Sequence, residues 1–192
     1  MLVSQDRWTY ERYLRETADG EYFTVIGGER ITPALALGAS VSPSPTFFHQ
    51  EIIGRIYNLL RRWALQSGPS TVVFSPLDVV LAEDEITQPD VMVVLNEHRA
   101  RITERNIQGA PDLVVEVLSP GSVRLDREKK RALYARHGIP EYWIVSPGER
   151  TVEVLQLRGA QYELAALYEE GETLQSPLLA GFICNTREIF ED

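Results

Sequence analysis

Cysteine is nearly missing from this sequence, and long apolar runs are missing altogether. Cys184 is the single cysteine among 192 residues, so an intrachain disulfide is impossible and a cluster of thiolate metal ligands is not expected. No apolar run approaches the roughly 18 residues that a membrane-spanning helix needs, and residues 1–16 lack the apolar core of a signal peptide. We therefore expect a cytoplasmic protein without a membrane span.

Basic residues are also in short supply. Nineteen lysines and arginines stand against 28 acidic residues, which gives a net charge of −9 at neutral pH. A basic footprint over the whole surface, of the kind that attracts nucleic acid, is therefore absent. If DNA is bound, local basic clusters and metal ions have to overcome long-range repulsion, and affinity has to fall steeply with salt.

The remaining composition is that of a folded protein. Apolar residues make up 44% of the chain and charged residues 24%, which is enough hydrophobic material for a core. The sequence contains no internal repeat and no linker-like segment, so residues 1–192 are expected to form one domain. A short helix is predicted within residues 1–20, and a hairpin that turns at Gly27-Gly28 follows. Residues 33–45 predict a loop or an edge strand.

A longer helix is predicted from the N-cap residue Thr46 to Gly68. Its apolar residues form one stripe at helical spacing: Phe48, Ile52, Ile56, Leu59, Leu60 and Trp63. His49 lies within this stripe, whereas Glu51 lies nearly opposite, on the solvated side. A histidine in an apolar stripe is commonly a hydrogen-bonded core residue, and it can also face a functional site.

From residue 71 onward the pattern changes to alternation and short apolar runs, which favour strands. Strands are predicted over 71–82, 87–95, 110–119, 141–146, 150–157 and 162–168, and the second and third are of the fully buried type. A helix is predicted over 122–137, with Gly138 and Pro140 ending it, and a last short helix after Asn185. Strands around a central helix predict a mixed α/β or α+β domain.

Asp90 and Glu116 interrupt two apolar strands. Residues two apart in a strand share a face, so Asp90 faces the same way as Met92, and Glu116 the same way as Val114. A carboxylate buried in this way has to be protonated, paired with a cation or bound to a metal. Two acids on neighbouring strands repel each other unless a cation lies between them, and an oxygen-bound ion such as Mg²⁺ or Mn²⁺ fits.

Lys130 is the third unusual position, because it falls on the inward arc of its predicted helix. The members of this arc are Val123, Asp126, Lys130, Leu133, Tyr134 and His137. Lys129 falls to one side. Two acids that hold a metal and a lysine that orients water form a hydrolytic set. A buried network of ion pairs explains the same residues without any chemistry, and both interpretations stay open at this point.

The second half of the chain contains the segment GAPDLVVEVLSPGSVRLDREKKRALYARHGIPEYWIVSPGERTVEVLQL, in which Asp126, Lys130 and Tyr134 follow EVLSP at steps of four and GIPEYW comes next. This combination resembles the Uma-two (Uma2) family of restriction endonucleases. The resemblance extends to QPDVMVV, to the helix PSPTFFHQEIIGRIYNLL and to the N-terminal EYFTVIGGERI, and so covers most of the chain. The family belongs to the PD-(D/E)XK nuclease superfamily, which implies a restriction-endonuclease-like fold.

The resemblance also implies roles for individual residues. The proline and aspartate of the superfamily's first element fall on Pro89 and Asp90, and the acid of its second element falls on Glu116. The usual lysine two residues later is replaced by Leu118. The resemblance therefore implies a lysine that has migrated to the following helix, where Lys130 matches the spacing.

Two residues of the first long helix complete this set. His49 matches a histidine that the family tends to carry at the start of its first core helix, and it is a candidate catalytic auxiliary. Glu51 is a weaker candidate for an additional metal-site acid, because it lies on the outer face of the helix.

We therefore predict a restriction-endonuclease-like α/β core (mixed α+β), with a central mixed sheet flanked by helices, an N-terminal hairpin and C-terminal antiparallel strands. The predicted activity is metal-dependent hydrolysis of DNA. Asp90 and Glu116 would hold Mg²⁺ or Mn²⁺ and Lys130 would assist the attacking water, in a hollow that solvent can reach. Two alternatives stay open: a catalytically silent protein that binds a protein partner, and a hydrolase of a small phosphorylated substrate. A homodimer, with one site for each DNA strand, is compatible with this activity.

Overall fold

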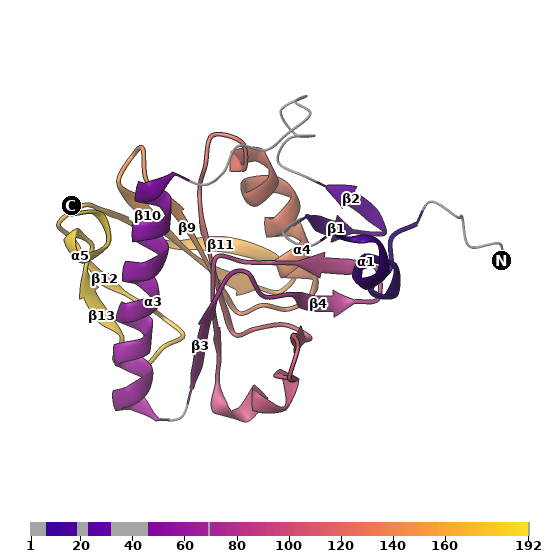
Figure 1. Ribbon diagram of the computed structural model, residues 1–192. Coiled ribbons are helices and arrows are strands. Elements are labelled where there is room, and N and C mark those ends of the chain that lie inside the picture. Colours follow the sequence, from indigo (N-terminus) through magenta and orange to yellow (C-terminus); the bar gives the residue numbers. More distant parts are fainter. Residues whose placement is uncertain (1–6, 19–22, 32–45, 69, 192) are drawn as a thin grey trace.

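Two β-sheets organise this computed structural model, which describes residues 7–18, 23–31, 46–68 and 70–191 (Figure 1). The larger sheet contains six strands in the order β11 (Gln161–Glu169), β10 (Thr151–Arg158), β9 (Glu141–Ser146), β8 (Leu113–Val117), β6 (Val91–Val94) and β3 (Thr71–Phe74). The smaller sheet contains five strands in the order β2 (Glu29–Ile31), β1 (Thr24–Ile26), β5 (Glu85–Thr87), β4 (Val79–Ala82) and β7 (Ile107–Gln108). A separate antiparallel pair joins β12 (Thr173–Gln175) to β13 (Ile183–Asn185).

The helical elements flank these sheets. They are α1 (Tyr10–Glu16), α3 (Phe47–Ser67), the 3₁₀ helix η1 (Asn96–Arg101), the π-helical turn η2 (Leu125–Lys130), α4 (Arg131–Arg136) and α5 (Arg187–Phe190). None of the helices in the described part of the chain is long and apolar enough to cross a membrane.

Each sheet mixes parallel and antiparallel pairs. Strands β8 and β9 run parallel in the larger sheet, and β4 and β7 in the smaller one, while the other paired neighbours run antiparallel. The predicted mixed sheet and the C-terminal antiparallel strands β10 and β11 are confirmed. The predicted N-terminal hairpin is confirmed too, because β1 and β2 join at Gly27-Gly28, whose φ angles of 59° and 80° suit a two-residue hairpin turn.

The larger sheet is covered by helices on both faces (Figure 1). Alternate residues of its buried strands point to opposite sides, as period-two patterning requires. The residues that pack with α3 are Val91, Val93, Leu113, Val115 and Val117. The residues that pack on the opposite side, with Leu133 and Tyr134 of α4, are Met92, Val94, Val114 and Leu118. Since Glu116 alternates with Val115 and Val117, it belongs to the face beneath α4.

The long helix α3 follows its predicted boundaries closely. The Thr46 hydroxyl accepts a hydrogen bond of 3.2 Å from the backbone N–H of His49, which caps the first turn, and Gly68 ends the helix at a φ of 118°. A side-chain cap of this kind is worth about 1 kcal/mol. The predicted apolar stripe is buried from Ile52 to Trp63, and Phe48 at its start is partly buried.

The predicted strand over 71–82 is wrong, because the chain divides there between the two sheets. β3 ends at Phe74 and β4 begins at Val79, after a turn through Ser75 and Pro76. Proline cannot donate a hydrogen bond to a sheet neighbour, and an uninterrupted strand through Pro76 would have needed one. The short elements β5, β7, β12, β13 and η1 were not predicted, and residues 1–6, 19–22 and 32–45 lie outside the described part of the chain.

A buried acid fastens the C-terminal segment to the larger sheet. Glu141 begins β9 and is fully buried. Its Oε1 accepts hydrogen bonds from Trp143 Nε1 (2.7 Å) and Ser176 Oγ (2.6 Å), and its Oε2 accepts one from the backbone N–H of Leu178 (2.9 Å). Burial raises the pKa of the Glu141 carboxyl, and the three donors oppose this rise. Glu141 thus links the GIPEYW segment to the chain that leads into β13.

We expect the stability difference between wild type and Glu141→Gln to depend on pH. Folding raises the pKa of the carboxyl, so its contribution to stability is complete below the unfolded pKa and is lost as pH rises through the folded pKa. The amide of the variant does not titrate. In urea unfolding, the free energy of unfolding of the wild type should therefore fall relative to that of the variant as pH rises above about 4.3, the ordinary pKa of a glutamate. A difference that does not change with pH would contradict this account.

Candidate active site

The structure brings Asp90 and Glu116 to the same end of two adjacent strands. Glu116 lies in β8, and Asp90 immediately precedes β6, which pairs with β8 so that Val91 lies opposite Val115. The Asp90 Oδ2 atom accepts a hydrogen bond of 2.7 Å from the backbone N–H of Val117. This bond ties one acid to the residue that follows the other. Asp90 was expected inside the strand and instead stands just before it.

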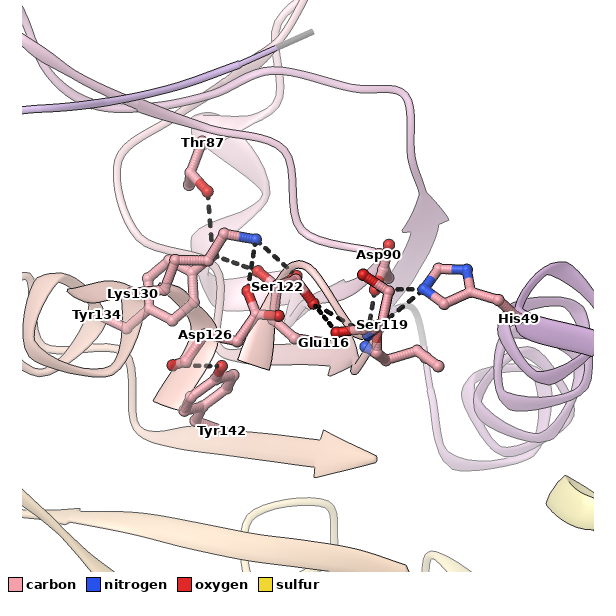
Figure 2. A network of polar contacts seen from close by, with 11 residues as sticks. His49, Thr87, Asp90, Glu116, Ser119, Ser122, Asp126, Lys130, Tyr134 and Tyr142 are labelled. Atoms are coloured by element: carbon pink, nitrogen blue, oxygen red, sulfur yellow. Dashed lines mark hydrogen bonds and ion pairs between the residues drawn. The ribbon is translucent and has the colours of Figure 1, made fainter. Parts of the chain in front are cut away.

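Lys130 reaches Glu116 from the following helix. Its Nζ atom lies 2.8 Å from Glu116 Oε2 and 3.0 Å from Asp126 Oδ1 (Figure 2). The exposed fractions of the Lys130, Glu116 and Asp126 side chains are only 9%, 3% and 2%. The ammonium group therefore lies between two carboxylates in a nearly dry environment, on the same side of the sheet as Glu116.

The helix that carries this lysine is irregular in its first half. The π-helical turn η2 leads directly into α4. A π-turn rotates the chain less per residue than an α-helix does, so an α-helical projection misplaces the residues before the turn. Val123, which was expected on the inward arc, is 40% exposed. His137, also expected on this arc, contacts the Glu85 carboxylate in the smaller sheet.

Two hydroxyl groups support Glu116 from the other side. Tyr134 donates a hydrogen bond of 2.6 Å to Glu116 Oε1, and its oxygen lies 3.0 Å from Thr87 Oγ1 in β5 (Figure 2). The sequence had placed Asp126 and Tyr134 on the inward arc but had assigned neither to the site. Thr87 carries no sequence signal, because it comes from the smaller sheet and only the fold brings it near.

His49 lies beside Asp90 at the first turn of α3. Its Nε2 atom lies 2.8 Å from the carbonyl oxygen of Val117 and 3.9 Å from Asp90 Oδ2. A carbonyl only accepts hydrogen bonds, so Nε2 carries the hydrogen atom and donates a hydrogen bond to the Val117 carbonyl. The Nδ1 atom is buried and has no hydrogen-bond partner among the described residues. In this arrangement His49 holds the end of β8 and is not placed to accept a proton through Nε2.

Glu51 stays apart from the other acids. It lies at the surface of α3 with 43% of its side chain exposed, and it pairs with Arg55 at 3.3 Å. The structure therefore does not bring this weaker candidate to the site.

The buried charges at the site do not balance. Two carboxylates, those of Glu116 and Asp126, contact one ammonium group, and a third, that of Asp90, acts on it electrostatically. Burial raises the pKa of Glu116 to about 8, where Lys130 opposes the rise and the neighbouring acids add to it. Burial likewise raises the pKa of Asp90, against the opposing effect of His49. Without a further cation, Glu116 therefore takes up a proton near neutral pH.

The lysine responds in the opposite way. Burial alone would lower the pKa of Lys130, but the carboxylates of Asp126, Glu116 and Asp90 outweigh that effect and raise it. Lys130 therefore stays charged at neutral pH. Asp90 is the most exposed of these acids, with 18% of its side chain accessible to solvent.

Comparison with known protein families shows to which family this chain belongs. The model of the Uma2 family, described as "Putative restriction endonuclease", matches residues 34–187. The chain belongs to the Uma2 family. The resemblance noted in the sequence is thereby confirmed, and Asp90, Glu116 and Lys130 all lie within the matched part of this Uma2 protein.

A solved structure shares the fold of this Uma2 protein. It is described as a "putative nuclease belonging to DUF820" from Anabaena variabilis, and it superposes with a TM-score of 0.74 at 20% sequence identity. The match covers 95% of this chain and 97% of the other. The predicted fold class, a mixed α+β nuclease fold, is confirmed by this likeness. A search of curated proteins found no match.

The buried lysine should matter far more for stability than its exposed neighbour does. Lys130→Met removes the ammonium group that contacts Glu116 and Asp126, and removal of one partner of a buried ion pair costs about 3–5 kcal/mol. Lys129→Met removes a solvent-exposed charge in the same turn and should change the free energy of unfolding by less than about 0.5 kcal/mol. Urea unfolding of both variants at neutral pH measures the difference. Equal effects would show that the Lys130 pairs contribute nothing to the fold.

Proposed function

We propose that this Uma2 protein hydrolyses DNA phosphodiester bonds with the help of a divalent metal ion. The observation that carries the proposal is the excess of buried negative charge around Lys130. A purely structural ion-pair network has no need for a third carboxylate, whereas a site that binds a cation does. The restriction-endonuclease description of the family supports DNA as the substrate.

Asp90 and Glu116 are the residues that would hold the ion. No group of three or more histidine, cysteine or acidic side chains is arranged as a metal cage within the described ranges. A site with two carboxylates suits Mg²⁺ or Mn²⁺, since such ions in phosphoryl-transfer enzymes commonly take one or two carboxylates and fill the rest with water and phosphate oxygens. The residues present therefore fit a hard, oxygen-bound ion.

The chain's own groups have distinct tasks in this proposal. When bound, the ion lowers the pKa of a water molecule and offsets charge on the phosphate. Lys130 stays protonated and directs its N–H groups at the attacking water and at the phosphate oxygens. Val117 N–H keeps the Asp90 carboxylate fixed. His49 keeps the neighbouring carbonyl in place and acts as an auxiliary through position rather than through proton transfer.

A second candidate function has one observation in its favour. The net charge of −9 opposes the approach of a polyanion, and it suits a catalytically silent protein that binds a protein partner. In that case the acid–lysine network only stabilises the core. Binding of a divalent ion separates the two candidates, because a network with a purely structural role has no reason to bind one.

Glu116→Gln should abolish both metal binding and DNA cleavage while the protein stays folded. The amide has the shape of the protonated carboxyl that the metal-free protein favours near neutral pH, but it cannot donate a carboxylate to the ion. We expect Mn²⁺ affinity, measured by calorimetry, to be lost, and plasmid cleavage to fall at least roughly 10²-fold.

The matched control is Glu51→Gln, which removes a carboxylate from the outer face of α3. This variant should bind Mn²⁺ and cleave plasmid as the wild type does. Cleavage by Glu116→Gln at the wild-type rate would overturn the proposed site, and absence of metal binding and cleavage in the wild type would overturn the proposed function.

DNA binding should weaken steeply as salt rises. Basic side chains on the helix that carries Lys130, among them the exposed Arg124 and Lys129, supply local positive charge on an acidic protein. Each phosphate contact releases counterions, so the logarithm of the binding constant should fall linearly with the logarithm of the salt concentration. Fluorescence anisotropy with a labelled duplex in Ca²⁺ measures the slope. A flat response would favour a small phosphorylated substrate instead.

A further inference from the structure

Asp126 is a buried acid that has no role in the proposed metal site. It lies in η2, four residues before Lys130, and its side chain is 2% exposed. Its Oδ1 atom lies 3.0 Å from Lys130 Nζ and accepts no hydrogen bond from the described residues. The carboxylate therefore acts on the lysine through its charge, in surroundings that screen that charge little.

Glu116, the other partner of Lys130, makes contacts through both of its carboxylate oxygens. Its Oε2 contacts Lys130 and its Oε1 accepts the hydrogen bond from Tyr134. A divalent ion bound to the same carboxylate would draw on its remaining lone pairs and would repel the ammonium group. An ammonium held by Glu116 alone would then be displaced from the site as soon as the ion arrived.

We propose that Asp126 is a positioning residue, which holds the Lys130 ammonium in the site while Glu116 is committed to the metal ion. The inference rests on the proposed function. It explains why the lysine has two carboxylate partners and why Oδ1 of the second accepts no hydrogen bond from the described residues. The π-helical turn contributes by keeping Asp126 and Lys130 on one side of the helix, facing Glu116 (Figure 2).

The same turn contains a matched control. Glu128 pairs with Arg124 at 3.1 Å, also four residues apart, but both side chains are largely exposed. Glu128→Gln therefore removes an acid from η2 without touching the site. It should leave cleavage and unfolding unchanged within about twofold.

The test is a double-mutant cycle on plasmid cleavage at saturating Mg²⁺, with Asp126→Asn, Lys130→Met and the combined variant. We expect Asp126→Asn to lower kcat roughly 10²-fold, because a small displacement of the lysine is enough, and to leave KM within about threefold. In the Lys130→Met background the same change should cost less than about threefold, since the residue that Asp126 positions is gone. Circular dichroism checks that each variant is folded.

Three results would overturn the inference. One is cleavage by Asp126→Asn within about threefold of the wild type, and another is an equal loss in both backgrounds, which would mean that Asp126 acts on the metal or substrate directly. The third is a wild type that neither binds metal nor cleaves DNA, which removes the proposed function as well. If Lys130→Met does not fold, Lys130→Arg replaces it, because the displaced charge should likewise make the Asp126→Asn effect smaller.

Discussion

The arrangement of the site depends on one nearly buried ammonium group that contacts two carboxylates and is influenced by the charge of a third. Charges in such surroundings interact strongly and are costly to leave unbalanced. Lys130 compensates for only part of the negative charge, and the high pKa of Glu116 is the direct consequence. In the metal-free protein, Glu116 therefore carries a proton at the position where the proposed function places a cation.

The surrounding structure keeps these groups close together. A backbone N–H fixes Asp90, a tyrosine hydroxyl fixes Glu116, and a π-helical turn presents the lysine and its second acid. π-turns within helices are frequent at functional sites, since they place side chains where a regular helix would not. The geometry of the site thus depends on an irregularity that would otherwise only weaken the helix.

Periodicity alone predicted much of this molecule. The stripe of α3, the glycine turn of the hairpin and the apolar run around Glu116 reflect local rules, so they could be predicted without any knowledge of distant contacts. The inward lysine was also identified, because the angular shift of a π-turn accumulates mainly in the residues before it. Val123 lies on that side of the turn and was misplaced for this reason. The division of 71–82 between two sheets and the contribution of Thr87 follow from tertiary packing, which no local pattern contains.

Thr87 gives the smaller sheet a significance beyond its size. Its hydroxyl lies against Tyr134, and Tyr134 in turn donates to Glu116 (Figure 2). The strands of the smaller sheet are therefore not an interchangeable accessory to the larger sheet. A chimera that carried the corresponding strands of another protein on this core would have to present a hydroxyl group at the same point. Without it, Tyr134 would lose its contact with Thr87, and the hydrogen bond that orients Glu116 would be less firmly held.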